Sequence, residues 1–255
     1  FAVKERPAWE ELIKPRLVPD RRRINFEGYR KARREAAETD RFFCWAGVNC
    51  FELMHPVCGH EHMLVGMAVD PDWVRDMAMT FVDLSIQLQE ILFAEEGLPD
   101  GIWYYEDMGF KQRPFMSPTM YREIIKPAHE KTMAFAHSLG LPVIMHSCGF
   151  IEPLLPDMVD AGIDCLQGME VKAGMDPLRI KSAFGDRLTL FGGMDARNLV
   201  ANDRDAIRAE LEAKIPQLME GSGYILHSDH SIPTTTDYET YRYFVDEGLR
   251  LGTYN

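Results

Sequence analysis

The regular alternation of short apolar runs with amphipathic stretches restricts the possible folds more than any other feature of this sequence. Six runs have the length and composition of strands: 42–48, 101–105, 142–145, 164–168, 188–192 and 223–226. Most precede a helical pattern, such as the face formed by Ile151, Leu154, Leu155, Met158 and Val159. Alternation of this kind predicts a parallel sheet with helices packed outside it.

Two architectures fit that alternation, an open doubly wound sheet and a (β/α)8 barrel. Neither G-x-G-x-x-G nor G-x-x-x-x-G-K-[ST] is present, which argues against a nucleotide-binding open sheet. Polar side chains follow successive strands: Glu106 and Asp107, His146 and Cys148, Glu170, Asp195, then His227, Asp229 and His230. In a barrel these strand ends converge on one mouth. We therefore predict an α/β fold of the (β/α)8 TIM-barrel class.

The order of elements also predicts how the chain is organised. Residues 1–40 form a helical lead-in, and residues 41–255 form the strand–helix units of a single domain. Asp70 and Asp176 each precede a proline and are expected to cap helices, whereas Gly140 is expected to end one. Six units are fewer than eight, and the chain begins without Met, so we expect it to lack the N-terminal portion of its barrel.

Charge and composition exclude several classes of partner. The chain carries 40 acidic and 28 basic side chains, for a net charge of -12, which disfavours binding to nucleic acid. We find no apolar run of about 18 residues, so no membrane association is expected. Five cysteines, without the pattern of a small disulfide scaffold, indicate a reduced, cytoplasmic protein.

His146-Ser147-Cys148-Gly149 is the most specific local motif. Residues two apart in an extended segment point to the same side, so His146 and Cys148 can reach one metal ion. Imidazole nitrogen and thiolate sulfur together are typical zinc ligands. The pattern H-x-C alone is weak, since it equally fits a buried cysteine beside an ordinary histidine.

A third ligand would complete a catalytic zinc site. The last strand is followed by His227, Asp229 and His230, each of which can supply a ligand at the barrel mouth. Three protein ligands with one open position are what a catalytic zinc requires. We expect Cys165 to lie in the core. His55, His60 and His62 lack the spacing that places two imidazoles on one helical face, and packing or surface roles are expected for them.

Several carboxylates are candidates for acid–base chemistry. Glu106 and Asp107 directly follow a strand, and Glu170 and Asp195 lie after two later strands. A helix-capping role is the alternative for Asp107. Trp103, Tyr104, Tyr105 and Gln112 belong to the same segment as the first pair and are expected to line a substrate pocket.

From about Trp9 to the C-terminus, the sequence resembles the uroporphyrinogen decarboxylase superfamily. The resemblance rests on Phe115-Met116-Ser117-Pro118, Tyr121, Pro127, His146-Ser147-Cys148-Gly149, Ala161-Gly162-Ile163-Asp164, Phe184-Gly185-Asp186-Arg187, Gly192-Gly193-Met194-Asp195, Gly223-Tyr224-Ile225-Leu226 and His230-Ser231-Ile232-Pro233. No single motif is decisive, but their order and spacing together are specific. The resemblance implies a (β/α)8 barrel with its site at the C-terminal mouth.

The superfamily contains two chemical branches. One removes acetate carboxyls from a tetrapyrrole in porphyrin biosynthesis and uses no metal. The other comprises zinc-dependent, corrinoid-linked methyltransferases, in which H-x-C and a distant cysteine hold the zinc. His146 and Cys148 match the first pair, and His230 stands at the distant position. The resemblance thus implies zinc held by His146, Cys148 and His230.

Replacing one thiolate by a neutral imidazole makes the zinc more Lewis acidic, which suits polarisation of an ether oxygen. We therefore predict a methyltransferase that moves a methyl group from a small donor, such as an aryl methyl ether, to a corrinoid on a partner protein. Uroporphyrinogen decarboxylase is the alternative, because histidine at position 230 also resembles that branch. A non-catalytic barrel is the second alternative.

Overall fold

The computed structural model describes residues 1–253 and contains six strands. They are β1 (Cys44–Val48), β2 (Gly101–Tyr105), β3 (Val143–Ser147), β4 (Cys165–Gly168), β5 (Thr189–Gly192) and β6 (Tyr224–Ile225). Their order in the sheet is their order in the chain. All six predicted strands are therefore confirmed, as is the α/β class.

Two strand ends differ from the prediction by two residues, and several others differ by one. β3 runs through His146 to Ser147, two residues beyond the expected end. β1 begins only at Cys44, because the Phe43 amide donates to the carboxylate of Asp100 at 2.8 Å instead of pairing with a neighbouring strand.

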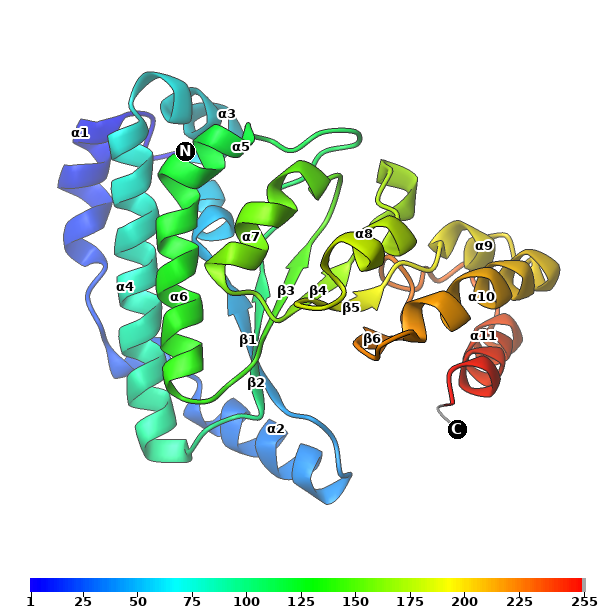
Figure 1. Cartoon of the computed structure of the whole chain (residues 1–255). Helices are drawn as coiled ribbons and strands as arrows, with labels where there is room; N and C mark the ends of the chain where they lie inside the picture. The colour runs from blue at the N-terminus through cyan, green and yellow to red at the C-terminus, as the bar shows by residue number, and fades with distance from the viewer. Residues whose placement is uncertain (254–255) are drawn as a thin grey trace. The chain divides into compact units, whose positions relative to one another are not determined.

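Helices connect the strands (Figure 1). The longer ones are α2 (Phe26–Glu38), α3 (Cys50–Val69), α4 (Pro71–Glu96), α6 (Lys126–Ser138), α10 (Arg204–Met219) and α11 (Tyr238–Leu251). The shorter α-helices are α1 (Arg6–Ala8), α5 (Pro118–Met120), α7 (Leu155–Ala161), α8 (Pro177–Phe184) and α9 (Ala196–Val200). Single turns of other helix types are η1 (Trp9–Ile13), η2 (Lys14–Arg16), η3 (Arg21–Arg23), η4 (Tyr121–Ile125), η5 (Glu152–Leu154) and η6 (Val171–Ala173).

The predicted helix boundaries agree with the structure. The Asp70 carboxylate accepts from the amide of Trp73 at the start of α4, and Asp176 accepts from two amides at the start of α8. Gly140 follows α6 with a φ of 73°, the left-handed conformation that commonly ends a helix.

The chain divides into two compact units. Unit 1 comprises Phe1–Met108, Phe115–Met145 and Pro153–Ile163; unit 2 comprises Gly109–Pro114, His146–Glu152 and Asp164–Asn255. The expected lead-in, residues 1–40, is helical and belongs to unit 1. There the fully buried indole of Trp9 donates to Asp76 on α4 at 2.8 Å.

In unit 1, β1 and β2 are parallel, with Val48 paired to Tyr105 at their C-terminal ends. Helices α4 and α6 run side by side, and α3 packs against α4 (Figure 1). Helix α4 is long and apolar enough to cross a membrane by length and composition, but half of its apolar window is buried inside the protein. Its buried side chains, among them Met77 and Phe81, place it as a core helix.

In unit 2, β4, β5 and β6 are parallel neighbours, with Gly168 paired to Gly192 where β4 and β5 end. Helices α8 and α11 each pack against α10 (Figure 1). Cys165 is 5% exposed in β4, which confirms its predicted place in the core. The parallel arrangement brings the loops after these three strands to the same edge of the unit.

Candidate functional site

His146 and Cys148 lie next to each other at the end of β3 in unit 2. The Sγ atom of Cys148 is 3.2 Å from Nε2 of His146. Two zinc ligands, nitrogen at about 2.0 Å and sulfur at about 2.3 Å from the ion, are about 3.5 Å apart in a tetrahedral site. The separation of these two atoms therefore fits a shared zinc ion, as the spacing of the motif predicts.

Gln167 on β4 fixes the orientation of the His146 ring. Its Oε1 atom is hydrogen-bonded to Nδ1 of His146, and Gln167 is 6% exposed. Because a carbonyl oxygen only accepts, Nδ1 carries the proton and Nε2 keeps its lone pair toward Cys148. Histidines that bind a metal typically donate their other ring N–H to such an acceptor. The sequence prediction missed Gln167.

The glycine of the H-S-C-G motif lets two backbone segments meet. Gly149 has a φ of 79°, and a Cβ atom there would lie 2.3 Å from the carbonyl carbon of Gly109. The amide of Gly109 donates to the carbonyl of Cys148 at 3.2 Å, so the loop beginning at Gly109 packs directly on the motif. A side chain at position 149 would therefore force the backbone of Gly109 or of Gly149 to shift.

We expect Gly149→Ala to destabilise the protein by at least about 2 kcal/mol, through its left-handed backbone and the clash with Gly109. Gly221→Ala is the matched control, because Gly221 has a φ of 68° with nothing within 4 Å of its Cβ position. Thermal and urea unfolding of both variants measure the difference. Equal losses of stability in the two variants would show that the clash at Gly149 contributes nothing.

A hollow of about 500 Å³ opens beside Cys148 within unit 2. Its lining includes Gln112 and the charged side chains of Glu170, Lys172 and Arg197. The Glu170 carboxylate accepts from the amide of Gly149 at 2.8 Å and pairs with Lys172 at 3.0 Å. The hydrogen bond that Lys172 donates to Glu170 raises the pKa of Lys172. The hollow places Gln112 and Glu170, two predicted site residues, close to Cys148.

Asp229 joins the loops that follow β4 and β5. Its buried carboxylate accepts from the amides of Val171 at 2.8 Å and Ala196 at 3.0 Å, and its own amide donates to Met194. Burial raises the pKa of this carboxyl. The contacts give Asp229 a structural role at this edge of unit 2.

Replacing Asp229 by alanine leaves two partly buried amides without their acceptor, and we expect a loss of about 1–3 kcal/mol in the free energy of unfolding. Asp186→Ala removes an exposed carboxylate from the same unit and serves as the control. Urea denaturation of both variants gives the comparison. A loss below about 0.5 kcal/mol for Asp229→Ala would contradict the role assigned to this residue.

His230 and Asp195 line a different hollow of unit 2 from the one beside Cys148. His230 is exposed and lines a smaller hollow with Asp195 and Arg197. Among the described residues, the ligand groups whose atoms lie within 4.8 Å of one another do not include His230. Burial opposes ionisation of Asp195, but hydrogen bonds from Arg197 hold its pKa below the usual value. Asp195 also caps α9, so its contacts are structural.

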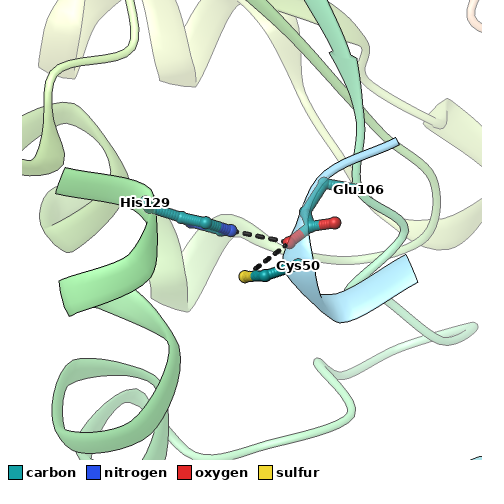
Figure 2. Close-up of side chains that lie close together, drawn as sticks. All are labelled: Cys50, Glu106 and His129. Carbon is teal, nitrogen blue, oxygen red and sulfur yellow. Dashed lines mark hydrogen bonds and ion pairs between the residues drawn. The ribbon is translucent and has the colours of Figure 1, made fainter. Parts of the chain in front are cut away.

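Unit 1 contains a buried hydrogen-bond network centred on Glu106 (Figure 2). One carboxylate oxygen accepts from the amide of Phe51 at 2.9 Å and from His129 Nε2 at 2.7 Å, and the thiol of Cys50 lies 3.4 Å away. The other oxygen accepts from the amide of Glu52 at 3.2 Å. Glu106 is 0% exposed. The sequence predicts Glu106 as a catalytic residue, but its contacts position the strand end and the start of α3.

The network continues through His129 to Tyr121. Because His129 Nε2 donates to a carboxylate, Nδ1 accepts from the Tyr121 hydroxyl at 2.9 Å. Burial holds the pKa of Tyr121 and of Cys50 well above their usual values, which suits both groups as donors. Cys50, Glu106 and His129 are spaced as a metal could require, yet hydrogen bonds already join them. No local sequence pattern indicates His129 and Tyr121 as members of this network.

The aromatic side chains of β2 alternate between two environments. Tyr104 is 0% exposed, and its hydroxyl accepts from Gln89 of α4 at 3.3 Å. Its predicted place in a substrate pocket is therefore wrong, because the alternation of a strand directs it into the core. Trp103 and Tyr105 share the opposite face, with ring centroids 5.9 Å apart, and Tyr105 is 44% exposed. Asp107 is half-buried just beyond the strand.

Comparison with known proteins agrees with the fold and the motifs. The sequence profile of uroporphyrinogen decarboxylase (URO-D) matches residues 56–249. The chain therefore belongs to the uroporphyrinogen decarboxylase family. A solved structure of a methyltransferase from Methanosarcina mazei aligns with a TM-score of 0.72 and 21% identity over 89% of this chain and 64% of that one. This likeness confirms the (β/α)8-barrel class.

Two curated relatives represent two activities. A methylcobamide:CoM methyltransferase of Methanosarcina barkeri is 33% identical over 113 residues, which cover 42% of this chain and 32% of the relative. A uroporphyrinogen decarboxylase of Thermus thermophilus is 31% identical over 134 residues, covering 51% of this chain and 37% of the relative. The matched segments thus span about a third of each relative's length.

Proposed function

We propose that this chain is part of a zinc-dependent methyltransferase that transfers a methyl group from a small donor to a corrinoid protein. The observation that carries the proposal is the geometry of His146 and Cys148. Their ligand atoms are 3.2 Å apart, and Gln167 holds the His146 tautomer whose Nε2 carries a lone pair that can bind a metal. A decarboxylase that uses no metal has no need of this arrangement.

His146 and Cys148 would hold the zinc, with His230 as the third ligand expected from sequence. The ion would act as a Lewis acid on the oxygen of an ether or alcohol methyl donor. The hollow beside Cys148, about 500 Å³ in volume, is large enough for a small aromatic donor. The name of the Methanosarcina barkeri relative, a methylcobamide:CoM methyltransferase, supports a corrinoid as the methyl carrier.

A methyl-transfer assay tests this function. The zinc-loaded protein is mixed with reduced free cobalamin and an aryl methyl ether, and the products are methylcobalamin and the corresponding phenol. We expect both products to form together and to be lost in Cys148→Ala. Transfer at the same rate without protein would contradict the proposal and favour a non-catalytic barrel. Unchanged transfer by Cys148→Ala would contradict the assignment of Cys148 as a zinc ligand.

His230 can be tested separately from the pair on β3. If His230 is the third ligand, His230→Ala will weaken zinc binding by at least about tenfold, and His230→Cys will restore it, because a thiolate is a competent zinc ligand. His227→Ala is a control from the same strand end. Competition with a chromogenic chelator measures each affinity. Unchanged affinity in His230→Ala would remove this residue from the ligand set.

Uroporphyrinogen decarboxylation is the second candidate, and the Thermus thermophilus relative of that name supports it. Uroporphyrinogen incubated with the protein would lose its acetate carboxyls and yield coproporphyrinogen, which is detected by chromatography after oxidation. We expect no product above the protein-free control. Turnover that survives removal of zinc would reverse the choice between the two functions.

A further inference from the structure

The hollow beside Cys148 has a positively charged wall. Among the described residues that line it, Lys111, Lys172 and Arg197 are cationic, and Glu170 is the one carboxylate. The wall therefore carries more positive than negative charge, although the whole chain has a net charge of -12. A hollow whose wall carries one sign of charge attracts ligands of the opposite sign. All of these residues belong to unit 2.

Glu170 holds the ammonium group of Lys172 close to the proposed zinc pair. One oxygen of Glu170 is 3.0 Å from Nζ of Lys172, and the other accepts from the amide of Gly149 at 2.8 Å. Gly149 directly follows Cys148, so these contacts fix the ammonium beside the motif. An ammonium has three N–H donors, so Lys172 keeps two for a ligand. Its side chain is 55% exposed, and a ligand can reach it.

Arg197 and Lys111 supply further donors to the same hollow. Nε and Nη2 of Arg197 donate to the carboxylate of Asp195, and Nη1 takes no part in that pair. Asp195 thus orients the guanidinium and offsets its charge, as Glu170 does for Lys172. Lys111 is exposed and makes no ion pair with a described residue, so its charge is not offset.

The loop that carries Lys111 also provides an aromatic surface. The amide of Gly109 donates to the carbonyl of Cys148 at 3.2 Å, and the amide of Phe150 donates to the carbonyl of Phe110 at 2.8 Å. These bonds fix the loop against the motif. Phe110 lines the hollow, and its side chain is 52% exposed. An exposed ring beside a hollow gives a planar apolar ligand a surface to pack on.

We propose that the methyl donor bound beside Cys148 is a small aromatic ether that carries a carboxylate group. Its ring packs against Phe110. Its carboxylate accepts charge-assisted hydrogen bonds from Lys111, Lys172 and Arg197. The ether end of the ring is left for the side of the hollow that Cys148 forms. This inference rests on the proposed methyl transfer, and it makes the three cations determinants of specificity that do not touch the reacting atoms.

Calorimetric binding in the absence of cobalamin tests the inference without any turnover. The probes are 4-methoxybenzoate and 4-methoxybenzamide, which share the ring, the ether and the shape but differ in charge. We expect the zinc-loaded wild-type protein to bind the benzoate at least about tenfold more tightly, and added salt to reduce this difference. Equal affinities for the two probes, or no binding of the benzoate, would overturn the proposal.

Two variants test whether the cations of the hollow hold the carboxylate. Lys111→Gln and Lys172→Gln should each weaken benzoate binding by about three- to fivefold, because ion pairs at exposed sites contribute modestly, and should leave benzamide binding unchanged. Arg242→Gln is the matched control, since it removes an exposed cation of α11 that lines neither hollow of unit 2. Benzoate affinities equal to that of wild type in both lysine variants would contradict the proposal.

A carboxylate can also bind zinc directly, so the titration is repeated after the metal has been removed with a chelator. We expect the preference for the benzoate to persist. Its loss would assign the carboxylate to the metal and overturn the inference.

The methyl-transfer assay separates this inference from the proposed function. Transfer from both compounds with equal kcat/KM would overturn the carboxylate preference and leave the proposed function standing. Selective binding of the benzoate without transfer from either compound would overturn the proposed function and leave the carboxylate site standing.

Discussion

His146→Ala and Cys148→Ala are each expected to lower zinc affinity by at least about a thousandfold, because each removes one of the two ligands at the end of β3. Gln167→Ala lowers affinity less, by about 10–100-fold, because Gln167 only orients the His146 ring. Chelator competition on the folded variants measures all three values.

The controls for this series separate metal loss from unfolding. Cys165→Ala removes a buried thiol from β4 without touching the proposed ligands, so it should keep its zinc. Circular dichroism and thermal unfolding establish that each variant is folded before its metal is counted. Retention of tightly bound zinc by both His146→Ala and Cys148→Ala would show that the metal binds elsewhere.

Glu106→Ala is expected to produce the largest loss of stability, about 3–5 kcal/mol in the free energy of unfolding. The substitution leaves the amides of Phe51 and Glu52 and the ring of His129 without their common acceptor inside the core. His129→Ala should cost less, because the carboxylate keeps its two amide donors. Urea denaturation monitored by fluorescence and circular dichroism gives both values.

A double-mutant cycle between Glu106 and His129 measures the coupling directly. We expect a coupling energy of at least about 1 kcal/mol, because the two side chains are hydrogen-bonded at 2.7 Å and almost fully buried. Glu61→Ala is the control for loss of an exposed glutamate. Additive losses in the Glu106/His129 pair would contradict a shared network.

The strand–helix alternation predicted the fold because hydrophobic periodicity reports directly on burial. All six strands appear where apolar runs indicated them, with ends displaced by local contacts such as the Phe43–Asp100 hydrogen bond. The proximity of His146 and Cys148 can also be predicted from the sequence, since the two-residue period of an extended segment determines which side chains share a face.

The rest of the site depended on contacts between distant parts of the chain. His129 lies 23 residues from Glu106, near the start of α6, and no local pattern connects the two. Gln167 resembles any other polar residue of a short strand until β4 brings it to His146. The prediction for Tyr104 is wrong because it assigns the whole aromatic run to one surface, whereas alternate residues of a strand point to opposite sides.

The zinc content and coordination of the intact wild-type protein test the central claim most directly. Mass spectrometry of the metal and X-ray absorption at the zinc edge give the stoichiometry and the ligand atoms on one sample. We predict about one tightly bound zinc per chain, with a sulfur ligand at about 2.3 Å that disappears in Cys148→Ala. Less than about half an equivalent of zinc, or a coordination shell without sulfur, would contradict the account.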